Sequence, residues 1–423
     1  MSTSALQTSA SETRNGPALA LPTRWPSLLR PDVLADAAGP TPFLLGSTEL
    51  VTSKLRRFRS AVREVQPFYA VKCNPDAGVL TALAAEGCGF EVASLGELEL
   101  LVGLGVDARE VLYSNTVKPA SHIKGAAELG LWRFAVDSAG EVAKVAREAP
   151  GSAVYVRLAV EDDQSAFPLS RKFGVDGGKA VALLLEARDR GLRPYGLTFH
   201  VGSQSTAPSA WTTALRRVAL IAAELLDLGI HLDMVDIGGG FPAWYGTPVP
   251  EIEEIGAAIT RGLASLPYTP ELLAAEPGRH LAAESAVMVA SVLGRERRGG
   301  QDWLHTDVGA YHGLIETQQT PSGWPYPLWT SRSDHGTAPS LSYVVTGPTC
   351  DSADTFLDRA LLPATMAEGD RLYIASAGAY TLSYASSFNG FPPPQARYTA
   401  TSISTVGRVV PQPSHAVALR SAG

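Results

Sequence analysis

Cysteine is scarce in this chain of 423 residues. Its three cysteines, Cys73, Cys88 and Cys350, are too few to form a disulfide framework, and they lack the spacing of metal ligands. We therefore expect no metal site. Free thiols are typical of a reducing compartment, so the cytoplasm is the simplest location for the protein.

Long apolar runs are absent as well. No stretch reaches the roughly 18 residues that a helix needs to span a bilayer, so we expect no membrane-spanning segment. Residues 1–22 are rich in Ser, Thr and Ala and show no apolar core followed by a cleavage site. This composition predicts a disordered tail rather than a signal peptide.

Positive charge is in deficit. The net charge is −7, which argues against a nucleic-acid partner, because proteins that bind nucleic acids usually present a basic face. A negative chain favours a cationic small molecule as substrate. The chain has seven lysines, and none follows Lys179, so covalent chemistry on a lysine amine must use one of these seven.

Apolar, often β-branched segments alternate with segments of helical spacing from about residue 66 to residue 285. Such alternation predicts a parallel sheet, and eight repeats predict a (β/α)8 barrel of the TIM type, which is an α/β fold. The predicted strands are residues 67–71, 89–92, 111–114, 133–136, 153–159, 194–199, 232–237 and 271–275.

The composition changes after the predicted barrel. Pro, Gly, Ser and Thr become more frequent and short alternating runs appear, which predicts a mostly β second domain. We place the barrel at residues 45–285 and the β domain at residues 23–44 plus 286–423. Residues 287–294 are interpreted as the crossover between the domains, and residues 316–340, rich in turn formers, as a long loop.

Polar side chains end nearly every predicted strand. Active sites of such barrels lie at the carboxyl ends of the strands, so these side chains should share one rim. Taken singly, each is more typical of a helix cap or a turn, but several on one rim indicate a ligand site. They are Lys72, Glu91, Asn115, Asp137, Arg157, His200, Asp236 and Glu276.

Lys72 is the most informative of these residues. It follows the apolar segment Pro67-Phe-Tyr-Ala-Val71. Burying an ammonium group is costly, and a lysine kept in such a place is usually a nucleophile whose pKa is lowered by burial. The alternative is a lysine that merely ends the strand in solvent.

Two later segments have the composition of a cofactor site. In Asp236-Ile-Gly-Gly-Gly-Phe-Pro242, the backbone N–H groups of three successive glycines can bind a phosphate. In Glu276-Pro-Gly-Arg279, the carboxylate can hold a protonated pyridine nitrogen and Arg279 can contact a phosphate, with an internal ion pair as the alternative. The imidazole of His200 can stack on an aromatic cofactor, and the hydroxyl of Ser203 can donate to its phosphate, although a lone strand histidine is more often a core residue.

The predicted β domain contains further candidate residues. Gly347-Pro-Thr-Cys-Asp351 sets a thiol beside a carboxylate in a turn, where the thiol can act as an exposed acid. Gly378-Ala-Tyr380 and Phe388-Asn-Gly-Phe391 add a phenol and aromatic rings. Ordinary buried core and turn residues are the alternative for each segment.

Together these segments resemble the fold-type III, pyridoxal-phosphate-dependent amino-acid decarboxylases, and within them the ornithine/lysine decarboxylase group. The resemblance implies a barrel like that of alanine racemase, followed by a β domain. It also implies a homodimer of two chains packed head to tail, so that each active site takes residues from both. The matching segments appear in the family's order and are residues 67–74, 89–94, 172–174, 200–203, 236–242, 276–279, 347–351 with Asp354, 378–381 and 388–391.

For the cofactor, pyridoxal 5'-phosphate, the resemblance implies these roles. Lys72 would bind the cofactor covalently, Glu276 would hold its pyridinium nitrogen, His200 would stack on its ring, and Arg157 would lie near its phenolic oxygen. Glu91 falls where many ornithine decarboxylases carry an aspartate near the lysine, so its role stays open. The phosphate would be bound by Ser203, Gly238, Gly239, Gly240, Arg279 and Tyr380.

The resemblance also implies residues that act on the substrate. Cys350 would come from the partner chain and protonate the α-carbon, and Asp351 would hold the distal amine of the substrate, with Phe388 beside it. The expected catalytic residues are Lys72, Cys350, His200 and Glu276. The expected reaction is the decarboxylation of a basic L-amino acid, ornithine or lysine, to a diamine and CO2.

Three alternatives stay open. Residues 313–317 are similar to bacterial lysine/ornithine decarboxylases, but the segment after them matches no pattern, so diaminopimelate or a modified diamino acid is another candidate substrate. A racemase on this scaffold would usually set an arginine against the ring nitrogen, where this chain has Glu276. A catalytically silent regulator of the same fold would be expected to lose Lys72 or Cys350, and both are present.

Overall fold

The computed structural model describes residue 34 and residues 39–320, 324–332 and 338–400. The predicted tail at residues 1–22 and the end of the predicted β domain after residue 400 lie outside the described residues. Within the described ranges, none of the helices combines the length and the apolar character that crossing a membrane requires.

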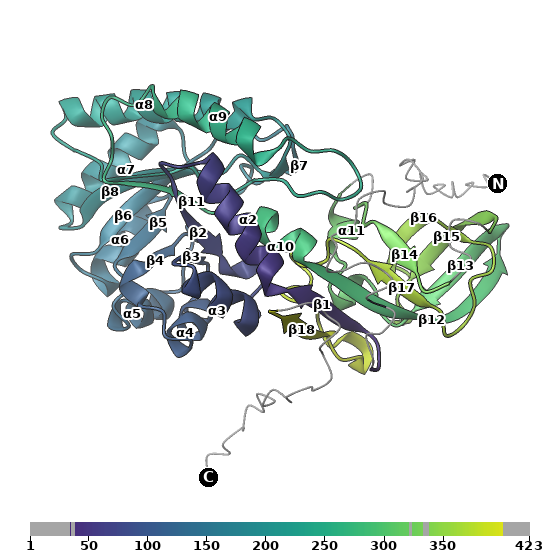
Figure 1. The fold of residues 1–423 in the computed structure, drawn as a ribbon. Coiled ribbons are helices and arrows are strands. Elements are labelled where there is room, and N and C mark those ends of the chain that lie inside the picture. Colours follow the sequence, from purple (N-terminus) through teal and green to yellow (C-terminus); the bar gives the residue numbers. More distant parts are fainter. Residues whose placement is uncertain (1–33, 35–38, 321–323, 333–337, 401–423) are drawn as a thin grey trace, which may run out of the picture.

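Eight parallel strands form a closed barrel, which confirms the predicted fold (Figure 1). Each strand overlaps one of the predicted segments, because the apolar β-branched runs are buried on both faces, as expected for a parallel sheet. The strands are β2 (Gln66–Ala70), β3 (Gly89–Val92), β4 (Val111–Tyr113), β5 (Arg133–Val136), β6 (Ala153–Leu158), β8 (Arg193–Phe199), β10 (Met234–Asp236) and β11 (Leu272–Ala275).

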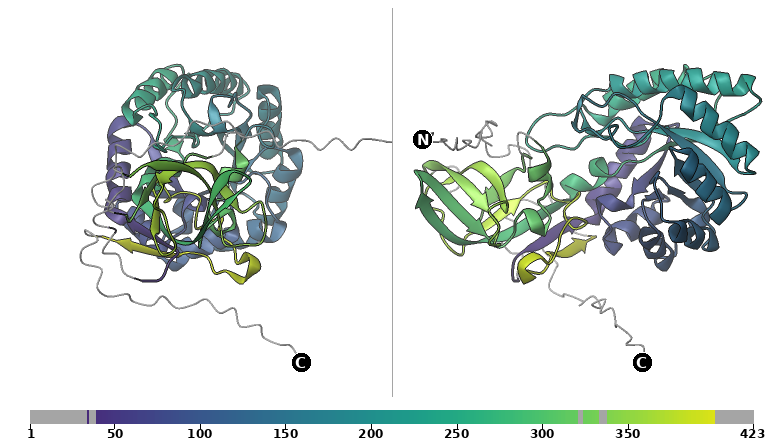
Figure 2. Two further views of the ribbon diagram at one scale, coloured as in Figure 1. Left: turned by 90° about the vertical axis from the view of Figure 1, so that its right-hand side faces the viewer. Right: turned by 180° about the vertical axis from the view of Figure 1, so that it is seen from behind.

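Helices surround the barrel on the outside (Figures 1 and 2). Several begin at a residue whose side chain accepts a backbone N–H of the first turn, such as Asp76, Ser94, Ser138 and Asp176. The longer helices are α2 (Thr48–Ala61), α3 (Ala77–Ala85), α4 (Leu95–Gly103), α5 (Ala120–Glu128), α6 (Ala139–Glu148), α7 (Gly177–Asp189), α8 (Ser209–Asp227) and α9 (Ile252–Leu263).

Shorter elements occupy the connections. The strands β7 (Ser165–Phe167) and β9 (Ser203–Ser205) form a separate two-stranded sheet after β6 and β8. The short helices α10 (Arg279–Ala282) and α11 (Glu316–Gln319) follow the barrel. The 3-10 helices of the described residues are η2 (Val71–Cys73), η3 (Ala108–Glu110), η4 (Ala283–Ser285), η5 (Ala310–His312) and η6 (Phe388–Gly390).

Side chains fill the interior of the barrel, as is usual for this fold. Phe68, Leu112, Tyr155, Tyr195 and Met234 belong to one buried cluster contributed by different strands. The hydroxyl of Tyr155 lies 2.9 Å from the hydroxyl of Ser114, which follows β4. This cluster therefore forms the floor beneath the carboxyl ends of the strands.

The second part of the structure is a mostly β unit beside the barrel (Figures 1 and 2). Its main path runs β14-β17-β12-β13-β15-β16, and β1 pairs with both β12 and β18. The strands are β1 (Phe43–Ser47), β12 (Ala286–Arg298), β13 (Gln301–Thr306), β14 (Leu328–Thr330), β15 (Ser340–Thr346), β16 (Thr355–Pro363), β17 (Arg371–Ile374) and β18 (Gln395–Thr399).

Three details differ from the sequence prediction. Residues 287–294 lie within strand β12 rather than forming only a crossover, because β12 pairs with β1, β13 and β17. Residues 45–47, which we assigned to the barrel, belong to β1 and pair with β12 and β18. The expected loop at 316–340 contains α11 and β14, and β14 pairs with β17.

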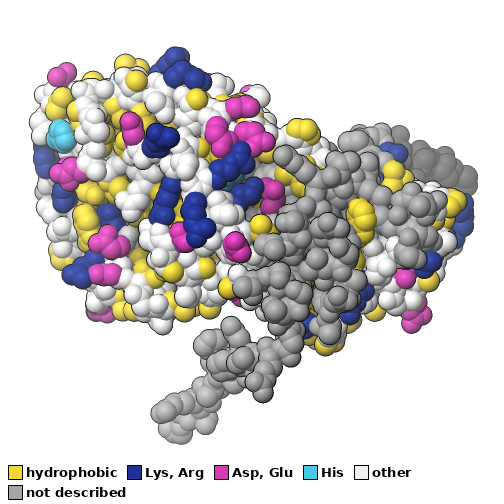
Figure 3. Space-filling view, in the orientation of Figure 1, with side chains coloured by type: hydrophobic (Ala, Val, Ile, Leu, Met, Phe, Trp, Pro, Cys, Tyr) yellow, Lys and Arg dark blue, Asp and Glu magenta, His cyan; other side chains and the backbone are white. Residues whose placement is uncertain are grey.

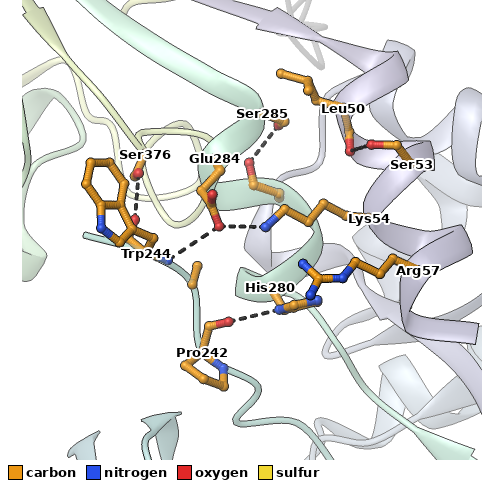
Figure 4. Close-up of polar contacts among 12 residues, drawn as sticks. Leu50, Ser53, Lys54, Arg57, Pro242, Trp244, His280, Glu284, Ser285 and Ser376 are labelled. Carbon is orange, nitrogen blue, oxygen red and sulfur yellow. Dashed lines mark hydrogen bonds and ion pairs between the residues drawn. The ribbon is translucent and has the colours of Figure 1, made fainter. Parts of the chain in front are cut away.

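Polar contacts fix the junction between the barrel and the β unit (Figure 4). Lys54 of α2 forms a 2.7 Å ion pair with Glu284 of η4, and the backbone N–H of Trp244 donates to the same carboxylate at 3.4 Å. The hydroxyl of Ser376, after β17, donates to the carbonyl of Trp244 at 2.7 Å. The segment after β10 is thereby tied to both units.

His280 of α10 belongs to the same junction (Figure 4). Its Nδ1 lies 2.9 Å from the carbonyl oxygen of Pro242. Burial and the nearby charge of Lys54 lower the pKa of His280 to about 4, so the ring is neutral and Nδ1 donates this bond. Acidic and basic side chains are intermixed on the face of the molecule that Figure 3 shows. At this junction Arg57 pairs with Glu251 and Glu253.

Candidate active site

Lys72 lies at the mouth of the barrel, in η2 just after β2. Its Nζ donates to Oε2 of Glu91 at 2.6 Å, and Glu91 comes from the neighbouring strand β3 and is 1% exposed. The Lys72 side chain keeps 42% of its surface accessible, and it lines a small cavity at the barrel mouth. The cavity is lined by Ala70, Lys72, His200, Ser203, Gly240, Phe241, Glu276, Gly278, Arg279 and Tyr380.

The protonation of Lys72 differs from the sequence prediction. Burial lowers the pKa of its ammonium, as expected, but the charge of Glu91, with smaller contributions from Tyr380 and Glu276, outweighs burial and raises the pKa above its ordinary value. The predicted free amine is therefore wrong for this state of the chain. Lys72 is an ammonium held by Glu91, and its proton has to leave before the amine can act as a nucleophile.

Three carboxylates gather at the ends of neighbouring strands. Burial raises the pKa of Glu276 to about 8, of Glu91 to about 7 and of Asp236 to about 6. Their mutual repulsion adds to the shift in each case. The three acids therefore disfavour one another's ionised form.

Hydrogen bonds fix two of these carboxylates. The Ser114 hydroxyl donates to Oε1 of Glu276. Asp236 accepts from Thr198 Oγ1 at 2.7 Å and from the backbone N–H of Gly238 at 2.9 Å. Glu276 is thus held in one orientation at the edge of the cavity.

His200 lies at the end of β8 as a neutral ring. Burial and the charges of Arg157 and Lys72 lower its pKa well below the ordinary value. Its Nδ1 accepts the backbone N–H of Gly202 at 3.0 Å, so the remaining proton is on Nε2. Arg157, at the end of β6, stacks its guanidinium on the ring of Phe173 at 5.2 Å.

The three glycines after β10 come too close to other backbone atoms to carry side chains. A Cβ on Gly238 would lie 1.8 Å from the carbonyl oxygen of Phe199, and a Cβ on Gly240 would lie 2.5 Å from that of Gly202. A Cβ on Gly239 would lie 2.8 Å from Nε2 of His200. Of the three, Gly240 lines the cavity, whereas the N–H of Gly238 donates to Asp236.

Arg279 reaches the cavity from the start of α10. Its Nε donates to the hydroxyl of Ser203 at 3.2 Å, and its guanidinium lies 4.7 Å from the ring of Tyr380. Its other edge forms a bidentate ion pair with Glu316. Arg279 thus pairs with Glu316, which lies outside the segment 276–279 in which the sequence left an internal ion pair as an alternative, and it also lines the cavity.

The predicted substrate residues lie elsewhere. Cys350 is exposed, and the carboxamide oxygen of Asn389 accepts its backbone N–H at 3.3 Å and its thiol at 3.5 Å. The Tyr311 hydroxyl donates to Asp351 at 2.6 Å and its ring lies 4.5 Å from that of Phe388. Among the described residues, none of these side chains lines the cavity around Lys72.

Sequence reasoning missed two residues of the site and a third residue that contacts Cys350. Ser114 is adjacent to Asn115, which we named as the strand-end residue, so a shift of one position would have found it. Glu316 lies in the segment 313–317, which we used only for its resemblance. Asn389 lies between the aromatic residues of the segment 388–391, and no feature of its position in the sequence indicates its contact with Cys350.

The family is shown by comparison with known proteins. A family model described as "Pyridoxal-dependent decarboxylase, pyridoxal binding domain" matches residues 48–283. The chain belongs to this family. It is therefore a pyridoxal-dependent decarboxylase of fold type III, and the resemblance noted in the sequence is confirmed.

Individual relatives agree with this assignment. The lysine/ornithine decarboxylase of Selenomonas ruminantium is 35% identical over 83% of this chain and 88% of that protein. The ornithine decarboxylase of Schizosaccharomyces pombe is 32% identical over 88% and 87%. The solved structure of a Vibrio vulnificus lysine/ornithine decarboxylase complexed with cadaverine matches with a TM-score of 0.78 and 32% identity, over 85% of this chain and 95% of that one.

Proposed function

We propose that this decarboxylase acts on a basic L-amino acid, ornithine or lysine, and releases a diamine and CO2, as in polyamine biosynthesis. The observation that carries the proposal is the arrangement of Lys72, Glu276 and His200 around one cavity. Relatives named for lysine and ornithine support the choice of substrate. The three unpaired cysteines support a location in the cytoplasm.

The residues of the cavity fit pyridoxal phosphate. The cofactor, when bound, supplies an aromatic ring that accepts the electron pair released with CO2. Lys72 is the amine at the cavity that can bind it covalently, with Glu91 in position to take the lysine proton. Ser203, Gly238, Gly239, Gly240, Arg279 and Tyr380 would hold the phosphate, Arg157 would lie near the phenolic oxygen, and His200 would pack against the ring.

Glu276 favours decarboxylation over racemisation. Its pKa of about 8 shows that burial and neighbouring Asp236 disfavour its anion. A protonated ring nitrogen beside Glu276 would supply the missing positive charge and stabilise the carboxylate. In turn Glu276 would keep a proton on that nitrogen, which an arginine in the same position would not do.

A second copy of the chain would complete the site. Phe388 and Phe391 are each 40% exposed and Tyr384 is 45% exposed, and the exposed Cys350 contacts Asn389, between the two phenylalanines. Aromatic residues at this exposure are typical of a surface that a partner covers. In the resulting homodimer, Cys350 would donate the proton to the α-carbon and Asp351, oriented by the hydroxyl of Tyr311, would hold the distal amine.

Release of CO2 tests the proposal. Purified protein loaded with pyridoxal phosphate would be incubated with ornithine, lysine, arginine and meso-diaminopimelate, and CO2 and amine products would be measured. We expect CO2 with ornithine or lysine, and none from a Lys72→Ala variant prepared in parallel. CO2 from diaminopimelate alone would favour the alternative substrate, and inverted stereoisomers without CO2 would contradict decarboxylation.

A further inference from the structure

Arg279 and Glu316 form a buried ion pair at the wall of the cavity. Both side chains are 4% exposed. Nη1 of Arg279 donates to Oε2 of Glu316 at 2.8 Å, and Nη2 donates to Oε1 at 2.5 Å. This two-point contact fixes the guanidinium plane more firmly than a single contact would.

The donors of Arg279 can be followed one by one. A guanidinium has five N–H groups in one plane. Glu316 takes the edge formed by Nη1 and Nη2, and the hydroxyl of Tyr245 takes the second N–H of Nη1 at 2.9 Å. The third edge, formed by Nε and the second N–H of Nη2, faces Ser203, whose hydroxyl accepts the Nε N–H at 3.2 Å and which lines the cavity.

Aromatic rings enclose the same guanidinium. Its central carbon lies 4.7 Å from the ring centre of Tyr380, 5.1 Å from that of Trp324 and 5.3 Å from that of Phe167 in β7. Such rings stabilise a cation over their faces and exclude water from it. The guanidinium therefore has little freedom to turn its donor edge away from the cavity.

Local sequence explains why Glu316 points to Arg279. After η5, Gly313 adopts a φ of +113°, and a Cβ there would lie 2.8 Å from the carbonyl oxygen of Thr381. Only glycine suits this turn. Leu314 is then buried, the hydroxyl of Thr317 donates to its carbonyl at 2.6 Å, and α11 begins with Glu316 facing inward.

We propose that Glu316 is a positioning residue for the cofactor phosphate. It holds the far edge of Arg279 so that the Nε–Nη2 edge faces the phosphate beside Ser203. Its negative charge lies on the opposite edge of the guanidinium, where it repels a phosphate less than Arg279 attracts it. The inference rests on the proposed role of Arg279 in binding the phosphate.

A comparison of two cofactors tests the inference. Cofactor-free protein would be titrated with pyridoxal phosphate and with pyridoxal, which lacks the phosphate, and binding would be followed by calorimetry and by visible absorbance. In Glu316→Gln, the amide N–H₂ of the glutamine would face an N–H group of Arg279. Both are donors, so they cannot form a hydrogen bond with each other. We expect the variant's affinity for pyridoxal phosphate to fall about tenfold to a hundredfold, the scale of a charge-assisted hydrogen bond, and its affinity for pyridoxal to change less than about twofold.

A second readout uses inorganic phosphate alone. Phosphate should raise the melting temperature of the cofactor-free wild-type protein, and the increase should be smaller in Glu316→Gln. Glu316→Asp keeps the charge but shortens the side chain, so we expect an intermediate loss. It also serves as the test variant if Glu316→Gln does not fold.

Glu284→Gln is the matched control. It removes the carboxylate that pairs with Lys54 at the junction between the barrel and the β unit (Figure 4). The guanidinium of Arg279 donates instead to Ser203, Tyr245 and Glu316. Its discrimination between the two cofactors should equal that of the wild type. An equal loss of pyridoxal phosphate and pyridoxal binding in the Glu316 variants would overturn the inference.

Arg279→Gln separates this inference from the proposed function. If Arg279→Gln loses pyridoxal phosphate affinity selectively but the Glu316 variants behave as wild type, Glu316 has no positioning role while Arg279 keeps its role. If Arg279→Gln itself leaves the preference for pyridoxal phosphate unchanged, the assignment of Arg279 to the phosphate is wrong, and the inference about Glu316 is wrong with it.

Discussion

Lys72 illustrates how the barrel prepares a single residue for chemistry. Its ammonium is paired with Glu91 at 2.6 Å and faces a cavity that also contains Glu276. The pKa of Glu91, about 7, makes this carboxyl able to accept and return a proton near neutral pH. We therefore expect Glu91, from β3, and Lys72, just after the adjacent strand β2, to act as one pair.

Replacing Lys72 by alanine should abolish covalent cofactor binding. Reduction of the loaded wild-type protein with borohydride, followed by peptide mass spectrometry, should place the pyridoxyl group on Lys72. The Lys72→Ala variant should carry no adduct, whereas Lys54→Ala, at the junction behind the site, should carry it as the wild type does. An adduct on a different lysine would contradict the assignment.

Replacing Cys350 by alanine should slow turnover by about 10²–10⁴-fold, the usual contribution of a positioned general acid. Cofactor uptake should be unchanged, because Cys350 does not line the cavity around Lys72 in the described part of its own chain. Turnover rate and cofactor content of the same preparation provide the check. Loss of cofactor uptake would show that the thiol has a different role.

At the scale of elements, the backbone of the loop after β10 packs directly against the backbone at the end of β8. Gly238 has a φ of +62° and lies against the end of β8, where a Cβ would be 1.8 Å from Phe199 O. No side chain fits there without moving one of the two strands. Packing thus requires these glycines independently of their proposed role in holding the phosphate.

Gly238→Ala should lower both stability and affinity for pyridoxal phosphate. The left-handed φ contributes on the order of 1 kcal/mol, and the clash adds to it. Gly229→Ala is the control, because its φ of +74° is similar and nothing lies within 4 Å of its Cβ position. Melting temperatures of the two cofactor-free variants should show the larger decrease for Gly238→Ala, and equal decreases would argue against the close approach.

The ends of β3, β10 and β11 bring Glu91, Asp236 and Glu276 together, and this makes the stability of the cofactor-free protein depend on pH. The pKa of Glu276 is raised to about 8, so the folded chain binds this proton more tightly than the unfolded chain. Its contribution to stability is complete below the ordinary glutamate pKa of about 4.5 and is lost as pH rises through about 8.

We therefore expect the cofactor-free protein to lose about 2–3 kcal/mol of unfolding free energy between about pH 6 and pH 9. Denaturant unfolding at the two pH values measures it. Glu276→Gln should remove most of the difference, because glutamine does not titrate. A wild-type protein whose stability is flat over this range would contradict the raised pKa of Glu276.

At the scale of the whole molecule, the barrel and the β unit divide the proposed chemistry. Lys72, His200 and Glu276 come from the barrel, whereas Cys350, Asp351 and Phe388 come from the β unit and lie on its exposed surface. The two groups do not meet within one chain. A dimer with twofold symmetry would bring the barrel residues of each chain together with the β-unit residues of the other chain, which forms two complete sites.

Mixing two inactive variants tests this division. Lys72→Ala and Cys350→Ala homodimers should each be nearly inactive. After exchange of subunits, half of the dimers are mixed and each contains one intact site, so activity should recover to about a quarter of the wild-type value. No recovery in a preparation shown to contain mixed dimers would place the whole site in one chain.

Much of this arrangement could be predicted because it depends on local patterns. The alternation of apolar and helical segments defined the barrel strands, and the parallel direction of those strands places Lys72, Glu91, His200 and Glu276 on one rim. The β unit was less predictable. Its long strand β12 and the pairing of β1 with β12 and β18 join segments far apart in the sequence, so no local pattern marks them.

The sequence by itself determined the parallel barrel, its chemically active rim and the family, because strand period, glycine runs and strand-end residues are local properties of the chain. Only the tertiary structure decided which charges meet. The Arg279–Glu316 pair, the contact of Ser114 with Glu276 and the charged state of Lys72 depend on distances between separate elements. Electrostatic energies vary with those distances and with burial, and neither is encoded in any short segment.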